Sequence, residues 1–210
     1  MRLPTYRIHL TLLTALLLTL CAPFAAGDSM SIDLSSNNLG ISGSVGTVTL
    51  ADTGSGSVMV TIAMNAGYTI KLQGGNVGFN TSASLNSGSI GSITIMAGGN
   101  NYTGLTFNNF KTTQNVSQFG TFAFDLSNFK GGPNGITSAD QLSFVISGVS
   151  VSQLSDFVIH FCNGSGTNCA PETGFAASSP ATPVPEPGSL TLLGTALVGL
   201  AGVARRRLFS

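Results

Sequence analysis

The sequence predicts an all-β protein: an antiparallel β-sandwich or jelly-roll-like domain, with an N-terminal signal peptide before it and a single C-terminal transmembrane helix after it. Three observations support this prediction. Short segments of alternating apolar and polar residues, separated by clusters of Gly, Asn and Ser, fill the middle of the chain. An apolar run follows two arginines near the start. A second apolar run, near the end, lies between a proline-rich stretch and three arginines.

Charge is scarce and unevenly distributed along the chain. Charged residues are 8% of the 210 residues, about a third of the usual share, whereas hydrophobic residues are 42%. This composition excludes a disordered polyelectrolyte. All arginines lie near the two ends, and between them three lysines are set against eight acidic residues. Such a surface has no basic patch for a phosphate backbone, so we expect no nucleic-acid partner.

Residues 1–27 have the pattern of a secretory signal peptide. Two arginines come first, a Leu-rich apolar run follows at residues 8–20, and small residues then offer a cleavage site. An N-terminal membrane anchor is the alternative, but the apolar run is short for a membrane span. A lipoprotein site at Cys21 is set aside because Leu20 before it is larger than such sites prefer.

Residues 28–175 are predicted to form the β-domain. In the segment SVMVTIAMN, residues 57–65, alternate side chains are apolar, as a half-buried strand requires. The side chains expected to face the core there are Val58, Val60, Ile62 and Met64. The segment YTIKLQ, residues 68–73, repeats the pattern, with Tyr68, Ile70 and Leu72 expected inward and Thr69, Lys71 and Gln73 outward.

Seven further segments have strand character. They are VGTVTL (45–50), NVGFN (76–80), SITIM (92–96), GLTFNNF (104–110), FGTFAFDL (119–126), QLSFVISG (141–148) and DFVIHF (156–161). About nine strands at this spacing favour a sandwich or jelly roll. Thirteen phenylalanines and no tryptophan supply much of the apolar volume, and the segment is long enough for one buried core. One domain is therefore expected.

Two cysteines stay in the chain once the signal peptide is removed. Cys162 and Cys169 enclose the flexible segment NGSGTN, and an exported protein leaves the reducing cytosol. We therefore predict a disulfide between them. It closes a short loop, so it would contribute about 2 kcal/mol and would pin that loop rather than hold the whole fold. A metal site would need at least two further soft ligands, and none lie nearby in the sequence.

The sequence contains little that suggests catalysis. His160, the one histidine beyond the signal peptide, is expected on a strand face with Val158 and Cys162, and no G-x-S-x-G motif is present. The segment DTGSG at residues 52–56 resembles one catalytic loop of aspartic proteases, but a second such loop is missing, and these residues are typical of a β-turn. No D-x-[DN]-x-[DN]-G calcium loop occurs. We expect no catalytic residue, cofactor or metal.

The C-terminal segment divides into three parts. Residues 176–187 hold four of the eight prolines and are predicted to form a stiff, exposed linker. Residues 188–204 contain no charge, and a helix of that length would span about 26 Å, enough for a thin bilayer. The basic tail, residues 205–210, begins with the membrane-stop residues Arg205, Arg206 and Arg207, which are expected on the cytoplasmic side. A buried globular helix is the alternative for this span.

This tail resembles a known sorting signal. Its proline-rich entry is Val184, Pro185, Glu186 and Pro187, and the apolar span and three arginines follow in order. This order is similar to the PEP-CTERM signal of Gram-negative bacteria that make extracellular polysaccharide. The resemblance implies that an exosortase of the inner membrane recognises the Pro-Glu-Pro stretch and releases or transfers the protein. Tails of this kind are also described as C-terminal domains of ice-binding proteins.

The expected function is that of an exported surface or extracellular-matrix protein, structural or adhesive, without enzymatic activity. Its expected partners are the exosortase, the inner membrane and extracellular polysaccharide. A carbohydrate-binding module is the nearest alternative, and it would need an exposed aromatic platform, for which Tyr68 and Tyr102 are the candidates. An ice-binding protein comes next and would need flat ranks of outward threonines.

Overall fold

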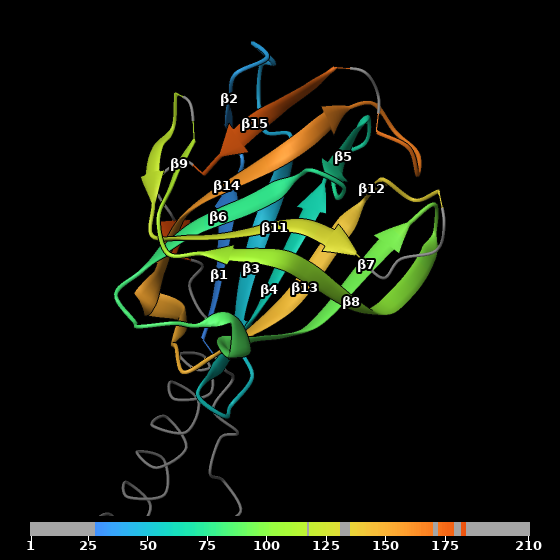
Figure 1. The fold of residues 1–210 in the computed structure, drawn as a ribbon. Helices are drawn as coiled ribbons and strands as arrows, with labels where there is room; N and C mark the ends of the chain where they lie inside the picture. Colours follow the sequence, from blue (N-terminus) through green and yellow to red (C-terminus); the bar gives the residue numbers. More distant parts are fainter. Residues whose placement is uncertain (1–27, 117, 131–134, 170–171, 179–181, 184–210) are drawn as a thin grey trace, which may run out of the picture. The chain divides into compact units, whose positions relative to one another are not determined.

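Strands joined by short turns make up nearly all of the chain that the structure describes (Figure 1). The structure is a computed structural model, and it describes residues 28–116, 118–130, 135–169, 172–178 and 182–183. The predicted signal peptide (1–27), sorting motif (184–187), membrane span (188–204) and basic tail (205–210) lie outside these residues. Within the described ranges, no helix is long and apolar enough to cross a membrane.

The elements follow one another closely along the chain. The first eight strands are β1 (Ser29–Asp33), β2 (Ser36–Asn37), β3 (Gly46–Asp52), β4 (Ser57–Met64), β5 (Tyr68–Lys71), β6 (Asn76–Thr81), β7 (Ile90–Ala97) and β8 (Asn100–Lys111). The others are β9 (Gln114–Val116), β10 (Gly120–Phe122), β11 (Phe124–Lys130), β12 (Ser138–Ala139), β13 (Gln141–Ser147), β14 (Leu154–Asn163), β15 (Thr173–Ala177) and β16 (Thr182–Pro183). Short 3₁₀ turns, η1 (Ser87–Ser89) and η2 (Val151–Gln153), precede β7 and β14.

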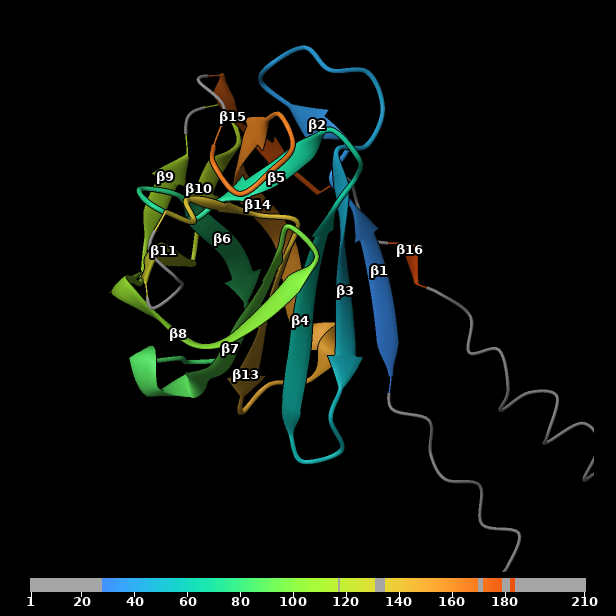
Figure 2. The ribbon, with the colours of Figure 1, turned by 90° about the vertical axis from the view of Figure 1, so that its right-hand side faces the viewer.

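Fourteen of these strands form one antiparallel sheet, in the order β12-β5-β14-β6-β11-β8-β7-β13-β4-β3-β1-β16. Beside this path, β15 pairs with β14, and β2 pairs with β15. β9 and β10 pair only with each other. We call β7, β13, β4, β3 and β1 the β4 half of the sheet, and β11, β6, β14 and β5 the β6 half. Figure 2 shows the two halves as separate layers, with β8 passing between them.

β8 is the strand at which the sheet turns. Its first part, from Asn100 to Leu105, pairs with β7, whereas Thr106 to Lys111 pair with β11. At the change of partner Ile93 pairs with Leu105 and Thr94 with Thr103, so Gly104 has no partner on β7. Gly104 has a φ of 75°, the left-handed conformation that glycine adopts without steric cost. This β-bulge bends the strand, as bulges do at the corners of folded sheets.

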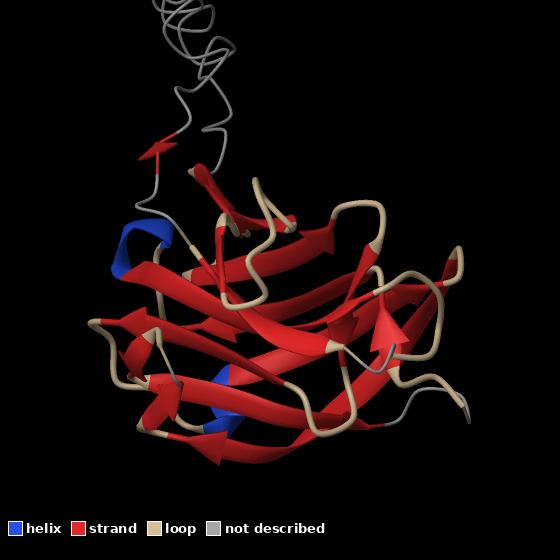
Figure 3. Cartoon of the chain, turned by 90° about the horizontal axis from the view of Figure 1, so that it is seen from above, coloured by secondary structure: helices blue, strands red, loops and turns tan. Residues whose placement is uncertain are grey.

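Both halves contribute to one hydrophobic core. Val60 and Leu142 come from the β4 half, Phe79 and Phe157 come from the β6 half, and all four are fully buried in the same cluster. The Phe79 ring stacks on Phe157 at a centroid distance of 5.8 Å. The two halves therefore pack against each other, and the layered arrangement can be followed from above in Figure 3.

The predicted all-β, antiparallel class is confirmed, and the two faces of the expected sandwich belong to one curled sheet. All nine predicted segments contain strands, although FGTFAFDL divides into β10 and β11 at Ala123. The predicted alternation in β4 is confirmed, because Val58, Val60 and Ile62 are buried and Met59 is 39% exposed. Thr69 lies on the outer face of β5 as predicted, but its side chain is fully buried, because a loop covers that face.

A β9–β10 hairpin packs on the face of the β6 half that points away from the core. Phe122 and Val116 of the hairpin contact Val158 and Ala177 in a second, smaller apolar cluster. This contact requires Gly78 beneath it, because a Cβ there would lie 2.8 Å from Val158 Cγ1 and 3.2 Å from Phe122 Cγ.

The last strand of the domain extends past its expected end. β15 includes Ala176 and Ala177, which were predicted to begin the linker. Both side chains are buried, and the Ser178 N–H donates to Phe157 O at 2.8 Å. Two small apolar residues can pack into the domain although prolines follow soon after them.

The bulge in β8 can be tested with Gly104→Ala. The new Cβ meets no atom within 4 Å, so the cost is conformational, and a left-handed alanine should lower the free energy of unfolding by about 1–2 kcal/mol. Urea unfolding of the purified full chain in detergent measures this. Gly91→Ala on β7 is the matched control, because it also has open space but no positive φ, and it should cost far less. Equal effects of the two substitutions would contradict the role of Gly104.

Candidate functional site

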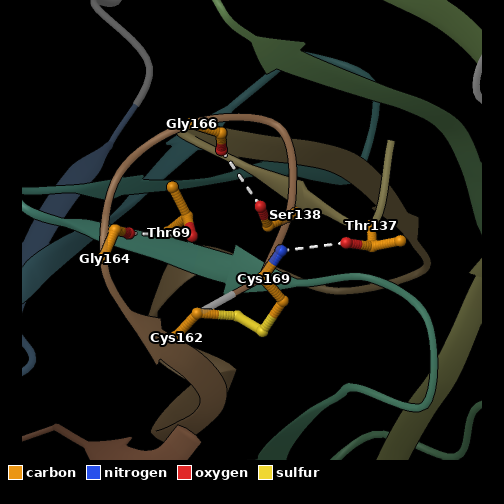
Figure 4. Close-up of a disulfide and its surroundings, with 7 residues drawn as sticks. All are labelled: Thr69, Thr137, Ser138, Cys162, Gly164, Gly166 and Cys169. Atoms are coloured by element: carbon orange, nitrogen blue, oxygen red, sulfur yellow. Dashed lines mark hydrogen bonds between the residues drawn. A yellow bond between two sulfur atoms is a disulfide. The ribbon is translucent and has the colours of Figure 1, made fainter. Parts of the chain in front are cut away.

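The predicted disulfide is present and holds a loop against the outer face of β5 and β12. Cys162 and Cys169 are joined across a Cα–Cα distance of 5.5 Å (Figure 4). Thr69 Oγ1 donates to Gly164 O at 3.2 Å, and Ser138 Oγ donates to Gly166 O at 3.0 Å. These contacts satisfy two hydroxyl groups that the loop removes from water. The disulfide thus pins a local loop, as the sequence predicts.

The DTGSG segment forms the turn between β3 and β4. The Gly54 N–H donates to Asp52 Oδ1 at 2.6 Å, and the Thr53 N–H donates to Ser57 O at 2.9 Å. Gly54 and Gly56 both have positive φ, which explains their place in a tight turn. The Asp52 carboxylate therefore has a structural role as a turn acceptor.

His160 is half-buried rather than a free surface residue. Its ring stacks on Phe175, which is directly opposite on β15, with a centroid distance of 4.4 Å. Burial, and then the nearby positive charge of Lys71, lower the pKa of His160 to about 4, although a hydrogen bond with the Gly74 backbone opposes this shift. The imidazole is therefore neutral at physiological pH and packs as an aromatic ring.

The two candidate tyrosines lie partly in the core. Tyr68 meets Phe161 edge to face at 5.9 Å, and both Tyr68 and Tyr102 are half-buried against the main cluster. They lie on different strands, β5 and β8. The structure therefore does not bring them together as an exposed aromatic platform.

A polar cleft of about 390 Å³ lies where β6, β8 and β11 meet. It is lined only by glycines and polar side chains: Gly74, Gly75, Asn76, Asn109, Lys111, Gln114, Asp125, Ser127 and Asn128. Among the described residues no group of His, Cys, Asp and Glu side chains could hold a metal ion, and this cleft contains a single carboxylate. We refer to this site as the polar cleft.

Asp125 forms the floor of the polar cleft. Its neighbours Phe124 and Leu126 belong to the core, so the Asp125 side chain points to the opposite face of β11. Asp125 is only 1% exposed. Asn76 Nδ2 donates to Asp125 Oδ1 at 3.0 Å, and Lys111 is directly opposite on β8. Burial raises the pKa of Asp125, although Asn76, Lys111 and Ser127 act in the other direction.

Hydrogen bonds also fix the walls of the polar cleft. Asn128 has a left-handed backbone, with a φ of 61°, and its N–H donates to Gly75 O at 2.9 Å. Asn128 Oδ1 accepts from the Gly74 N–H at 3.3 Å. On the other wall Lys111 Nζ donates to Gln114 Oε1 at 3.0 Å. The cleft is therefore formed by ordered strands and one tight turn.

A second cleft of about 390 Å³ lies beside the β9–β10 hairpin. Its walls combine Phe119 and Phe122 with Asn80 and Asp156. Asn80 Nδ2 donates to Asp156 Oδ2 at 3.2 Å, and Asn80 Oδ1 accepts from the Ala123 N–H at 2.7 Å. Asn80 thus bonds to groups of the protein through both ends of its amide, and the walls of the second cleft mix aromatic with polar side chains.

Sequence reasoning missed Asp125 and the polar cleft. The available signal was an acidic residue within the apolar segment FAFDL, which predicts either a strand edge or a partnered buried carboxylate. The other cleft residues come from three segments that are far apart in sequence: 74–76, 109–114 and 127–128. Nothing in their spacing indicates that they meet.

The role of the disulfide can be tested by replacing both Cys162 and Cys169 with Ser. We expect a loss of about 2 kcal/mol in the free energy of unfolding, because the unfolded chain has more conformational freedom without the cross-link. Urea unfolding with and without dithiothreitol measures the effect. The reductant should lower the wild-type protein to the level of the double variant and leave that variant unchanged. Global unfolding of the double variant in buffer would contradict a local role.

The buried carboxylate can be tested with Asp125→Asn. A folded-state pKa above the unfolded value means that the contribution of Asp125 to stability is lost as the pH rises through the folded-state pKa. Asn cannot ionise and keeps an oxygen for Asn76, so the variant should be more stable than wild type at pH 7. This advantage should shrink toward acidic pH in thermal unfolding between pH 3 and pH 8, because Asp125 of the wild-type protein becomes protonated there and its burial then costs less. A variant that is less stable at pH 7 would contradict this reasoning.

Comparison with known proteins identifies a motif at the C-terminal end of the chain. Residues 183–207 match the family model of the PEP-CTERM protein-sorting motif. The matched segment contains Val184, Pro185, Glu186 and Pro187 near one end and Arg205, Arg206 and Arg207 at the other, all outside the described residues. No curated protein sequence and no solved structure matches the chain. The C-terminal tail is a PEP-CTERM sorting motif, which implies an exported protein processed by an exosortase.

Proposed function

We propose that this protein is carried across the inner membrane by its signal peptide, held there for a time by residues 188–204, and then passed by an exosortase to the cell surface or extracellular matrix. There the β-domain has a structural or adhesive role in a polysaccharide matrix. The observation that carries this proposal is the sorting motif at residues 183–207. Pro185 and Pro187 would keep Glu186 in an extended segment that a peptidase can reach.

Two features of the β-domain support an extracellular location. The disulfide between Cys162 and Cys169 is of a kind that persists in oxidising compartments and is rare in the cytosol. The loop that it closes is also tied to β5 and β12 by hydrogen bonds, so the folded domain keeps the segment between the two cysteines in the position that the disulfide requires.

A non-enzymatic role is part of the proposal. The Asp52 carboxylate bonds within its own turn, and the neutral His160 ring stacks on Phe175. Neither group lines the polar cleft or the second cleft. A nucleophile and a base would have to meet in a cleft for acyl-transfer chemistry.

Carbohydrate binding is the second candidate function. The polar cleft favours it, because amide, hydroxyl and carboxylate groups gather there around a hollow of ligand size.

Ice binding is supported less well. Hydroxyl side chains do form one row across the paired strands of the β4 half and the first part of β8, namely Ser31, Thr49, Thr61, Ser143, Thr94 and Thr103. The flanking positions include Met59, Val145 and Met96, and Ser143 is buried. A single row with apolar neighbours is narrower than the ranks of threonine that this function would need.

The proposal can be tested by deleting Pro185–Pro187 in the native host. The deleted protein should accumulate at full length in the inner membrane, because the exosortase loses its recognition sequence while the span stays. Cell fractionation and C-terminal mass spectrometry measure this. Deletion of residues 179–181, three linker residues before the matched segment, is the control and should leave sorting unchanged. Normal release of the protein without Pro185–Pro187 would overturn the proposal.

A further inference from the structure

We propose that the polar cleft binds a neutral saccharide through hydrogen bonds to the sugar hydroxyl groups. This inference rests on the proposed function, because it names the class of ligand that the exported domain would hold in a matrix. The evidence is the shape of the cleft, the kinds of group that line it, and the presence of a buried carboxylate at its floor.

The lining has the chemistry that sugar hydroxyls require. Each hydroxyl both donates and accepts hydrogen bonds, and side-chain amides do the same from one planar group. Asn76, Asn109 and Gln114 supply amides, and Asp125 adds a strong acceptor. Asn109 is exposed on the wall of the cleft, whereas Asp125 lies at its floor. A hydroxyl pair of one ring could therefore meet an acceptor below and an amide at the side.

Two opposite charges make an ionic ligand a poor fit. Lys111 lies directly across from Asp125 on the neighbouring strand, so the cleft has one positive and one negative side chain. An anion would meet the Asp125 carboxylate, and a cation would meet the Lys111 ammonium group. A divalent cation would also require more carboxylate ligands than this single one. A neutral, hydroxyl-rich molecule encounters neither repulsion.

The cleft volume suits a small ligand. About 390 Å³ lies near the lower end of the range for ligand sites in proteins, which suits one or two sugar rings rather than a long segment of chain. Hydrogen bonds hold both walls: Asn128 is bonded to the turn at Gly74 and Gly75, and Lys111 is bonded to Gln114. The binding groups are therefore positioned before a ligand arrives, which lowers the entropy cost of binding.

The floor residue itself argues for a ligand. A carboxylate that is 1% exposed costs stability when it ionises, and an amide of the same shape would keep the bond to Asn76 without that cost. Groups that reduce stability in this way are common at binding sites, where function needs them. Ionised Asp125 would be a stronger acceptor for a sugar hydroxyl than the amide oxygen of an asparagine.

The test is ligand binding by the full chain, solubilised in a detergent without a sugar headgroup. Saturation-transfer NMR and calorimetry would use glucose, galactose, mannose, N-acetylglucosamine and the disaccharides cellobiose and maltose. Sodium phosphate and calcium chloride are separate arms. We expect saturable binding of at least one neutral sugar and none of either ion. Binding of phosphate or calcium instead of sugars, or of nothing in the panel, would overturn the proposal.

Substitutions of cleft residues test whether the sugar binds in the polar cleft. Asp125→Asn should weaken sugar binding about tenfold and Asn109→Ala about fivefold, because each loses a hydrogen bond to the ligand. Asn101→Ala is the matched control, since it is exposed on the same strand as Asn109 but outside the cleft, and it should bind as wild type does. Because Asp125→Asn is expected to be the more stable protein at pH 7, weaker binding cannot result from unfolding. An affinity for sugar that is unchanged in both cleft variants would overturn the assignment of this site.

This test separates the two proposals. Binding is measured on purified protein and does not depend on the exosortase, whereas sorting is measured in cells and does not depend on the cleft. Absence of sugar binding, with release still blocked by deletion of Pro185–Pro187, would reject only the cleft. Sugar binding together with normal release of the protein that lacks Pro185–Pro187 would reject only the proposed route.

Discussion

The fold depends on one change of partner within a single strand. β8 pairs with β7 along its first part and with β11 along its second part, and Gly104 gives the bend between them. Because of this bend, the apolar faces of the β4 half and the β6 half meet in one core. A straight β8 would leave two amphipathic half-sheets side by side, each with an apolar face in water. The buried phenylalanines could then not pack across the interior.

The folded sheet has two outer faces, and they differ in how far other elements cover them. On the β6 half, the β9–β10 hairpin packs over Gly78, and the disulfide loop covers Thr69. These additions bury apolar and hydroxyl groups that would otherwise face solvent, and they create hollows at their borders. The outer face of the β4 half has no such cover among the described residues and is mostly small or hydroxyl side chains. Local additions to a regular sheet are thus the origin of both clefts.

Much of the fold could be predicted from sequence because it depends on local alternation. β4 shows this most simply, since Val58, Val60 and Ile62 alternate with Met59 and Thr61, and the packing follows. The burial of Thr69 could not be predicted, because it is set by a loop almost a hundred residues later in the chain. The same is true of Asp125, whose partners Asn76 and Lys111 lie on two other strands. The sorting motif was predictable because its order of proline, apolar span and arginine is continuous in sequence.

The distribution of charge connects the fold to the proposed role. The three lysines of the chain, Lys71, Lys111 and Lys130, all lie on β5, β8 and β11, which build the β6 half and its corner. The strands of the β4 half carry none. The face with the hairpin, the polar cleft and the lysines can offer specific hydrogen bonds, whereas the opposite face offers a regular, nearly uncharged surface. This asymmetry fits the proposed sugar site, because the polar side chains that would bond a neutral ligand gather on one face of the domain.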